Sequence, residues 1–86
     1  MKYKNHKRER EIKEALEEYK DCFERYHDKY IAAKALAKRL RDASLEDKDT
    51  TEYKYSADLA FAKSIFDAEI EYALAIYVSI ARKKHT

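Results

Sequence analysis

Apolar residues in the first half of the chain recur at alternating steps of four and three. The row consists of Ile12, Leu16, Tyr19, Phe23, Tyr26, Tyr30, Ala33, Ala37 and Leu40. Its mean step of about 3.5 residues is the period of a coiled-coil seam. Small or apolar residues at Ala15, Cys22, Leu36 and Ala43 widen the stripe on one flank, which suits a helical bundle better than a two-stranded rod. The pattern predicts a first helix over about residues 6–43.

The second half of the chain carries two apolar rows. The first row is Phe61, Ile65, Ala68, Tyr72 and Ile76, and the second is Leu59, Ala62, Phe66, Ile70, Ala73, Tyr77 and Ile80. At 100° per residue the rows lie roughly 120° apart round one helix, and Leu74 and Val78 add apolar surface beyond residue 71. One neighbouring helix cannot cover both rows. We therefore expect a second helix over about residues 51–83 that packs against the first helix and against a further surface.

The segment between these patterns, residues 44–50, is polar, and the chain contains no glycine and no proline. Ser44 with Asp47, and Asp49 with Glu52, both have the spacing of an N-cap followed by an acidic third residue. Thr50 and Thr51 disfavour one continuous helix, which is the alternative. The sequence predicts an all-α fold: a single domain over residues 1–86, in which an antiparallel helical hairpin of two long helices dimerises into a four-helix bundle.

If the chain turns near Asp47, a residue of the first helix lies opposite a residue of the second helix when their numbers add to about 94. Tyr26 then faces Ala68, and Tyr19 faces Ala75 or Ile76, so large side chains meet small ones. Glu69 lies between the two apolar rows of the second helix. A carboxylate in such surroundings needs a partner. We expect it to form a register-fixing ion pair with Lys29 or His27 of the facing helix, or with a second subunit.

Composition supports a folded amphipathic helical protein, because charged residues make up 42% and hydrophobic residues 45% of the chain. A chain of 86 residues buries little surface alone, so a partner subunit is an expected source of further burial. The one cysteine, Cys22, excludes an intramolecular disulfide and suits a reducing compartment, which predicts a cytoplasmic location. The longest apolar run, residues 72–81, is about half the ~20 residues that a membrane span needs. We therefore expect no membrane association.

Charge is distributed unevenly along the chain. Residues 1–10 carry a net +4 and residues 82–86 a net +3, so that residues 11–81 carry −5. In a hairpin the basic ends meet at one pole, and the turn forms an acidic pole. Cations are favoured at a helix C-terminus and disfavoured at an N-terminus, so the N-terminal group indicates a solvated tail or a surface for an anionic partner such as nucleic acid. This basic surface consists of Lys2, Lys4, Lys7, Arg8, Arg10, Arg82, Lys83 and Lys84.

Candidate chemistry is sparse. Glu24 and His27 have the E-x-x-H spacing of di-iron bundles, but the seam register places both outside the core, and we predict no metal and no cofactor. Cys22 has no histidine placed to activate it and is interpreted as a packing residue. No catalytic residues are assigned, so the chain is not expected to be an enzyme or to bind a small-molecule substrate.

These features favour a non-enzymatic protein interaction module, an adaptor or inhibitor that self-associates and offers helical surfaces to another protein. The predicted partner or oligomer interface is Leu59, Ala62, Phe66, Ile70, Ala73, Leu74, Tyr77, Val78 and Ile80. The alternative is a nucleic-acid-binding helical dimer that uses the basic termini. Small chains without motifs are common among phage and mobile-element accessory proteins, which is one expected origin.

Overall fold

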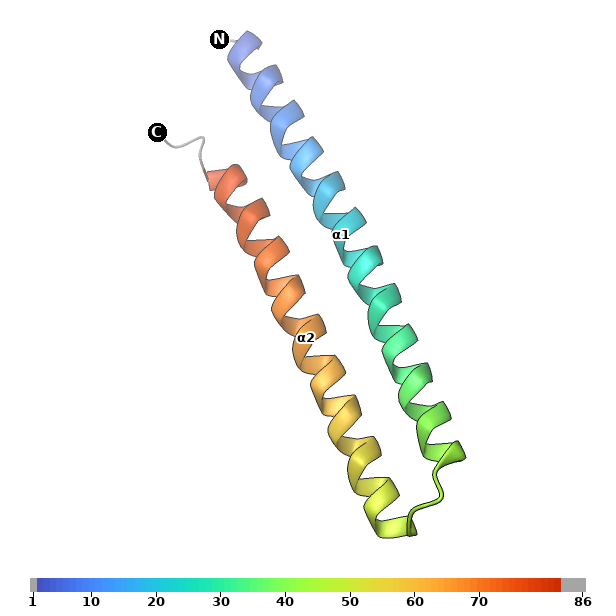
Figure 1. Ribbon diagram of the computed structural model, residues 1–86. Coiled ribbons are helices and arrows are strands. Elements are labelled where there is room, and N and C mark those ends of the chain that lie inside the picture. Colours follow the sequence, from blue (N-terminus) through green and yellow to red (C-terminus); the bar gives the residue numbers. More distant parts are fainter. Residues whose placement is uncertain (1, 83–86) are drawn as a thin grey trace.

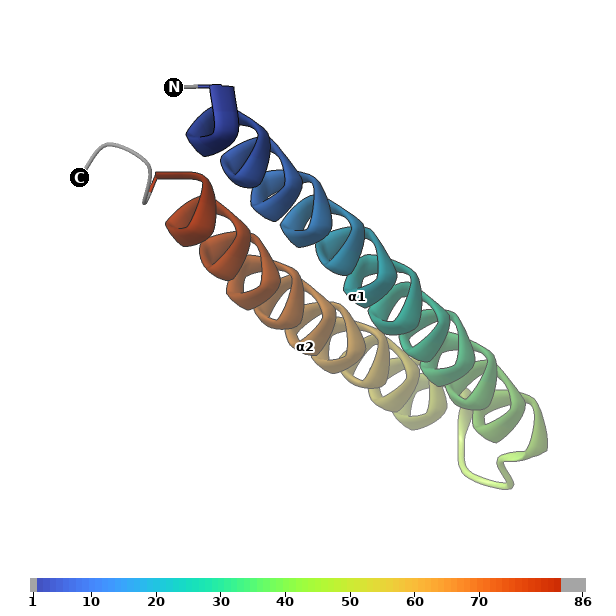
Figure 2. The same cartoon turned by 90° about the horizontal axis from the view of Figure 1, so that it is seen from above.

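The chain forms a long antiparallel hairpin of two helices. The computed structural model describes the backbone of residues 2–82 and the side chains of residues 6–82. Helix α1 spans Lys2–Ala43 and helix α2 spans Lys48–Arg82, and they lie side by side along their shared length (Figures 1 and 2). The Cα extents are 69 × 18 × 7 Å. The predicted all-α hairpin is confirmed, with no strand in the described residues.

The turn occupies residues 44–47, and Asp47 is the N-cap of α2. Its carboxylate accepts hydrogen bonds from the backbone N–H of Thr50 at 3.0 Å and from the Thr50 hydroxyl at 2.7 Å. The two caps expected from the sequence, Ser44 and Asp49, are wrong. The partner at the third helical position is a threonine in place of the acidic residue that the capping-box spacing requires.

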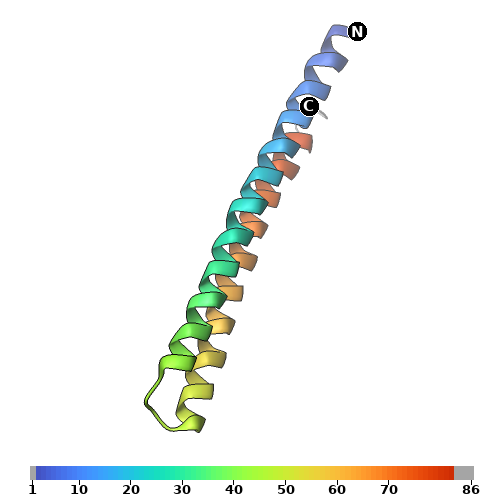
Figure 3. The same ribbon diagram turned by 90° about the vertical axis from the view of Figure 1, so that its right-hand side faces the viewer.

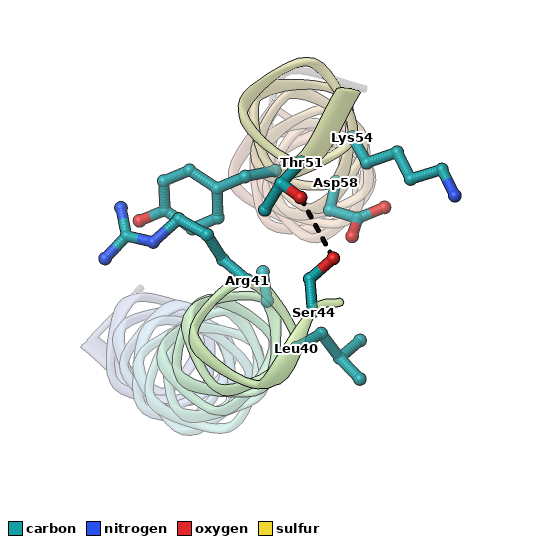
Figure 4. Close-up of a pocket in the computed structure, with 8 residues that line it drawn as sticks. Leu40, Arg41, Ser44, Thr51, Lys54 and Asp58 are labelled. Atoms are coloured by element: carbon teal, nitrogen blue, oxygen red, sulfur yellow. Dashed lines mark hydrogen bonds between the residues drawn. The ribbon is translucent and has the colours of Figure 1, made fainter. Parts of the chain in front are cut away.

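Hydroxyl groups join the two sides of the turn. The Ser44 hydroxyl accepts the backbone N–H of Glu46 at 3.1 Å and bonds the Thr51 hydroxyl at 2.9 Å (Figure 4). Thr51 Oγ1 in turn donates to the carbonyl of Glu46 at 3.5 Å. Within the described residues no backbone φ is positive, so this turn closes without the left-handed residue for which glycine is usually required.

Aromatic contacts show the register between the helices. Tyr30 stacks on Phe66 with ring centroids 5.0 Å apart, and Tyr19 contacts Tyr77 at 6.1 Å. In both contacts the residue numbers add to 96, as they do where Arg41 lies over the Tyr55 ring. Residue n of α1 is therefore level with residue 96 − n of α2. The predicted sum of about 94 is within about two residues of this register. At the level of Tyr19, the large ring of Tyr77 lies where the sequence predicts only smaller side chains.

The inter-helix seam is lined by small residues. Among the described residues, Ala15, Ala37 and Ala73 are buried, with 7%, 4% and 6% of their surface exposed. The heptad pattern places larger residues there, but Phe23 is 40% and Leu40 57% exposed. Of the buried alanines of α1, Ala37 belongs to the predicted row and Ala15 to the flank beside it. The hairpin alone consequently has no core of large side chains.

Helix α1 is longer than α2 and starts earlier than the sequence pattern predicts. It begins at Lys2 instead of about residue 6, whereas α2 ends at Arg82, level with residue 14 of α1. The first three turns of α1 therefore project beyond the end of α2 (Figures 1 and 3). The basic N-terminal segment is helical.

Replacing Asp47 by alanine is expected to lower the melting temperature of the hairpin by several degrees at neutral pH, because α2 loses its cap. The two bonds from Thr50 hold the pKa of Asp47 below its ordinary 3.8. A carboxylate whose pKa is lower in the folded state stabilises the fold fully at pH values above its ordinary pKa. This stabilisation is lost as the pH falls through the lowered pKa. The difference between wild type and Asp47→Ala should therefore shrink below pH 3.8, as measured by circular dichroism.

Two matched variants control this experiment. Asp47→Asn retains an oxygen acceptor for the Thr50 N–H and should melt close to wild type without the acid-dependent loss. Asp49→Ala removes a first-turn acid that makes no cap bond and should change the melting temperature less than Asp47→Ala. Equal effects of Asp47→Ala and Asp49→Ala would contradict the assignment of the cap.

Candidate interaction face

Most of the second apolar row of α2 is used inside the hairpin. The Phe66 ring contacts Phe23 at 5.9 Å and Tyr30 at 5.0 Å, and Ala73 is 6% exposed. The other predicted interface residues that are half-buried are Leu59, Ala62, Ile70, Tyr77, Val78 and Ile80. Leu74, at 43% exposed, lies outside the seam. Helix α1 therefore covers most of this row, and the first apolar row of α2 remains accessible.

The first apolar row of α2 faces solvent. Phe61 is 68%, Ile65 40%, Tyr72 67% and Ile76 46% exposed. At 100° per residue these four side chains fall within about 60° of one another, on one flank of α2. The sequence analysis places the predicted partner or oligomer interface on the neighbouring row. The turn distinguishes the two rows. Thr51 bonds Ser44 and therefore faces α1. The same face of α2 continues through Tyr55, Ala62 and Phe66.

A shallow groove runs between the helices along this exposed flank. Three hollows lie in it, of about 130, 100 and 60 Å³. Their linings include Leu40 and Asp58 near the turn, Lys29 and Ile65 in the middle, and Cys22 and Ile76 toward the termini. Each hollow is smaller than the roughly 300–1,000 Å³ of a small-molecule pocket. The shape suits side chains of another helix better than an enclosed ligand.

Alanines form much of the groove floor, and larger apolar side chains stand beside it. Ala15, Ala33, Ala37, Ala62 and Ala73 contribute to the linings. We define the groove face as this floor together with six large apolar residues, each at least 40% exposed: Leu36, Leu40, Phe61, Ile65, Tyr72 and Ile76. Near the turn, Leu40, Lys54 and Asp58 lie on the same side of the Ser44–Thr51 bond, and Arg41 lies on the other (Figure 4).

One ion pair crosses the groove near its middle. Lys29 Nζ lies 2.8 Å from Glu69 Oε2, and the side chains are 61% and 24% exposed. The predicted pairing of Glu69 with Lys29 is confirmed. Exposed pairs of this kind contribute on the order of 1 kcal/mol or less. Its main effect is to fix a charge of each sign at a defined level of an otherwise apolar face.

The opposite flank of the hairpin also carries exposed apolar and charged side chains. Phe23 and Leu74 are exposed there, but they alternate with the exposed lysines Lys20, Lys34 and Lys63. Lys34 Nζ lies 4.5 Å from the Tyr30 ring centroid, and Lys63 Nζ lies 3.1 Å from Asp67 Oδ2. Charges of this kind keep such a flank hydrated. On the groove face, six large apolar side chains are each at least 40% exposed.

The basic surface predicted at the termini is only partly described. Lys7, Arg10 and Arg82 are exposed, and Arg8 is half-buried. The side chains of Lys2 and Lys4, and residues Lys83 and Lys84, lie outside the described residues. At the other pole, Glu46 pairs with Lys54 at 2.6 Å and Asp42 with Arg41 at 3.3 Å. The turn is therefore less uniformly acidic than its carboxylates alone indicate.

The residues examined for chemistry make packing or surface contacts. The His27 ring stacks on Phe23 at 5.9 Å and lies 5.8 Å from the Phe66 ring, while Glu24 is exposed. Arg25 Nη2 donates to Cys22 Sγ at 3.3 Å. Among the described residues no three His, Cys, Asp or Glu side chains gather as metal ligands. Neither described helix has an apolar stretch sufficient to span a membrane.

Comparison with known protein families, curated proteins and solved structures gives no match for this chain. The surface of the molecule is therefore the guide to its function. The chain exposes 7321 Å², whereas a compact monomer of this length exposes about 5,400 Å². The hairpin therefore exposes more surface than a compact domain of the same length.

Two phenylalanines of α2 test the division into an internal and an external row. Phe66→Ala should lower the free energy of unfolding of the hairpin by about 2 kcal/mol, because it removes a half-buried ring from the seam. Phe61→Ala should change that of the unassociated chain by less than about 0.5 kcal/mol. Urea titrations followed by circular dichroism, repeated over a range of protein concentrations, separate hairpin stability from association. A larger effect of Phe61→Ala at the lowest concentration would reverse the assignment of the rows.

Proposed function

We propose that this chain is a small non-enzymatic helical interaction module, an adaptor or inhibitor that acts by offering its groove face to another protein subunit. The observation that carries the proposal is the exposure of Phe61 and Tyr72, which are 68% and 67% accessible on one flank. Contiguous apolar patches of this kind on a soluble protein are typical of interaction sites.

The size of the groove face is adequate for recognition. Its six large apolar side chains expose on the order of 600 Å² together, given the 150–250 Å² of a whole aromatic residue. A stable interface takes about 800 Å² from each partner, and the alanine floor and the flanking charged stems supply the remainder. Covering Phe61 and Tyr72 alone would contribute roughly 1.5–3 kcal/mol each.

The groove favours a helical occupant. A helix or hairpin laid along it would place side chains into hollows spaced along both α1 and α2, as in helix-in-groove recognition. The Lys29–Glu69 pair would give such an occupant a polar contact that fixes its register. The free thiol of Cys22 suits a reducing environment, and we propose the cytoplasm as the site of action.

Photocrosslinking in native cells tests this proposal. With Tyr72 replaced by a benzophenone amino acid, irradiation should give covalent adducts to whichever protein covers the groove face. The control position is Asp28, which is exposed on the outer side of α1 and should give several-fold fewer adducts. Equal yields at the two positions, or none at Tyr72, would overturn the proposed function.

The second candidate function is nucleic-acid binding. It is favoured by the helical projection of α1 beyond Arg82, which carries the exposed Lys7 and Arg10. Phosphate contacts predict an affinity that falls about log-linearly with salt concentration. Binding to DNA or RNA should then be measurable at low salt and be lost when Lys7 and Arg10 are both changed to glutamine. Absence of binding at low salt would remove this candidate.

A further inference from the structure

We propose that the flank opposite the groove face is a second docking surface, and that its partner is an amphipathic helix of another protein with acidic residues at heptad spacing. The surface is built on a row of basic residues along α1. We define the basic row as Lys13, Lys20, His27, Lys34 and Arg41, each seven residues after the last. The inference goes beyond the proposed function, because it concerns a different face and a partner of stated chemistry.

The basic row follows one edge of the seam between the helices. Tyr30 stacks on Phe66 and Ser44 bonds Thr51, so two positions of α1 that are fourteen residues apart both face α2. Residues at multiples of seven therefore keep the same side of this helix pair. Arg41 lies on the side of the Ser44–Thr51 bond away from the groove face (Figure 4). The row is thus a line about 42 Å long on the opposite flank, with a basic residue every 10.5 Å or so.

The lysines of the row have no acidic partner across the seam. On α2 this edge is formed by Lys63 and the residues seven positions before and after it, and none of them is acidic: Ser56, Ile70 and Tyr77. Within the described residues no ion pair forms at Lys13, Lys20 or Lys34, whereas on the groove side Lys29 reaches Glu69 at 2.8 Å. Charges at the edge of a coiled-coil seam commonly pair with opposite charges of a neighbouring helix. The row is therefore available to carboxylates of another chain.

Apolar side chains beside the row give a helix a surface on which to pack. Phe23 is 40% and Leu74 43% exposed. Their numbers add to 97, so they lie at nearly the same level of the hairpin, between the levels of Lys20 and Lys34. An amphipathic helix laid along this flank would cover both with its apolar stripe. Acidic residues at every seventh position beside that stripe would then meet the basic row at the same 3.5-residue period.

Carboxylates border the row on its outer side and distinguish between two kinds of anionic partner. Glu17 and Glu24 are exposed one turn after Lys13 and Lys20, and Asp67 is exposed on α2. A nucleic acid carries a negative charge at every phosphate, so its backbone would meet these carboxylates and be repelled. A protein helix can carry cations beside its acidic residues and so match both signs. The charge pattern of the flank therefore favours a protein helix.

Fluorescence anisotropy with a labelled peptide tests this proposal. The probe is a helical peptide of about 28 residues, four heptads, with leucine at both seam positions and glutamate at one flanking position of each heptad. It should bind the purified chain at low salt. Changing both Lys20 and Lys34 to glutamine should weaken binding about tenfold, because two charge contacts are lost.

Two matched controls separate the row from overall charge. Arg25→Gln combined with Arg39→Gln removes two exposed cations of α1 at the same fourteen-residue spacing, about 140° round the helix from Lys20 and Lys34. This variant should bind the peptide within about twofold of wild type. A peptide of the same composition, with its glutamates spread round the helix, should bind wild type about tenfold more weakly than the probe.

Each outcome decides the proposal. Weaker binding confined to the lysine variant, at an unchanged melting temperature, together with preference for the probe over the control peptide, supports it. Equal effects of the two double variants, equal affinities for the two peptides, or no binding at low salt would overturn it. Duplex DNA that displaces the probe and is equally sensitive to the Lys20 and Lys34 changes would assign the row to nucleic acid.

The groove face provides the remaining comparison. If probe binding is lost in Tyr72→Ala and retained in the lysine variant, the peptide occupies the groove face. That result would overturn the second docking surface and leave the proposed function standing.

Discussion

The contact between the Ser44 and Thr51 hydroxyls, at 2.9 Å, is the constraint on which the rest of the molecule depends. Asp47 fixes where α2 begins, and Thr51 fixes which way it faces. Because Thr51 points at α1, the residues that follow it at helical spacing, including Ala62, Phe66 and Ala73, also meet α1. The row one third of a turn away is left uncovered. The contacts of these two side chains in the turn thus agree with the face that α2 presents to α1.

Alanine at the seam has a second effect on that surface. A small side chain at a helix contact brings the backbones together and leaves little volume between them, so larger neighbours are displaced to the edges. Ala15, Ala37 and Ala73 are buried, whereas Leu40 and Phe61 are more than half exposed. The apolar residues that would fill the core of a globular domain therefore line a groove. The burial of alanines at the seam and the exposure of larger apolar residues beside it are thus two results of one arrangement.

The sequence predicts the elements of this fold well and its rotational details poorly. Heptad spacing identifies both helices, and an isolated carboxylate among apolar residues correctly indicates the Lys29–Glu69 pair. The choice between the two rows of α2 is not accessible from hydropathy, because both rows are apolar and of similar length. The choice between the rows depends on the turn. Ser44, Asp47 and Asp49 are all suitable N-cap residues, and only the folded turn shows that Asp47 is the one used. The observed register differs from the expected one by about two residues, and it brings Tyr19 to Tyr77.

The four-residue turn also has a kinetic meaning. Every contact between α1 and α2 closes a loop through residues 44–47, and the sequence separation rises steadily from Ser44–Thr51 to Tyr19–Tyr77. The smallest entropy cost of closure belongs to the contacts beside the turn. Folding should therefore nucleate beside the turn and propagate toward the termini. Growth of each helix and pairing of the two helices would be coupled at each step. The capping residues would then act on the folding rate, and the aromatic contacts near the termini on the unfolding rate.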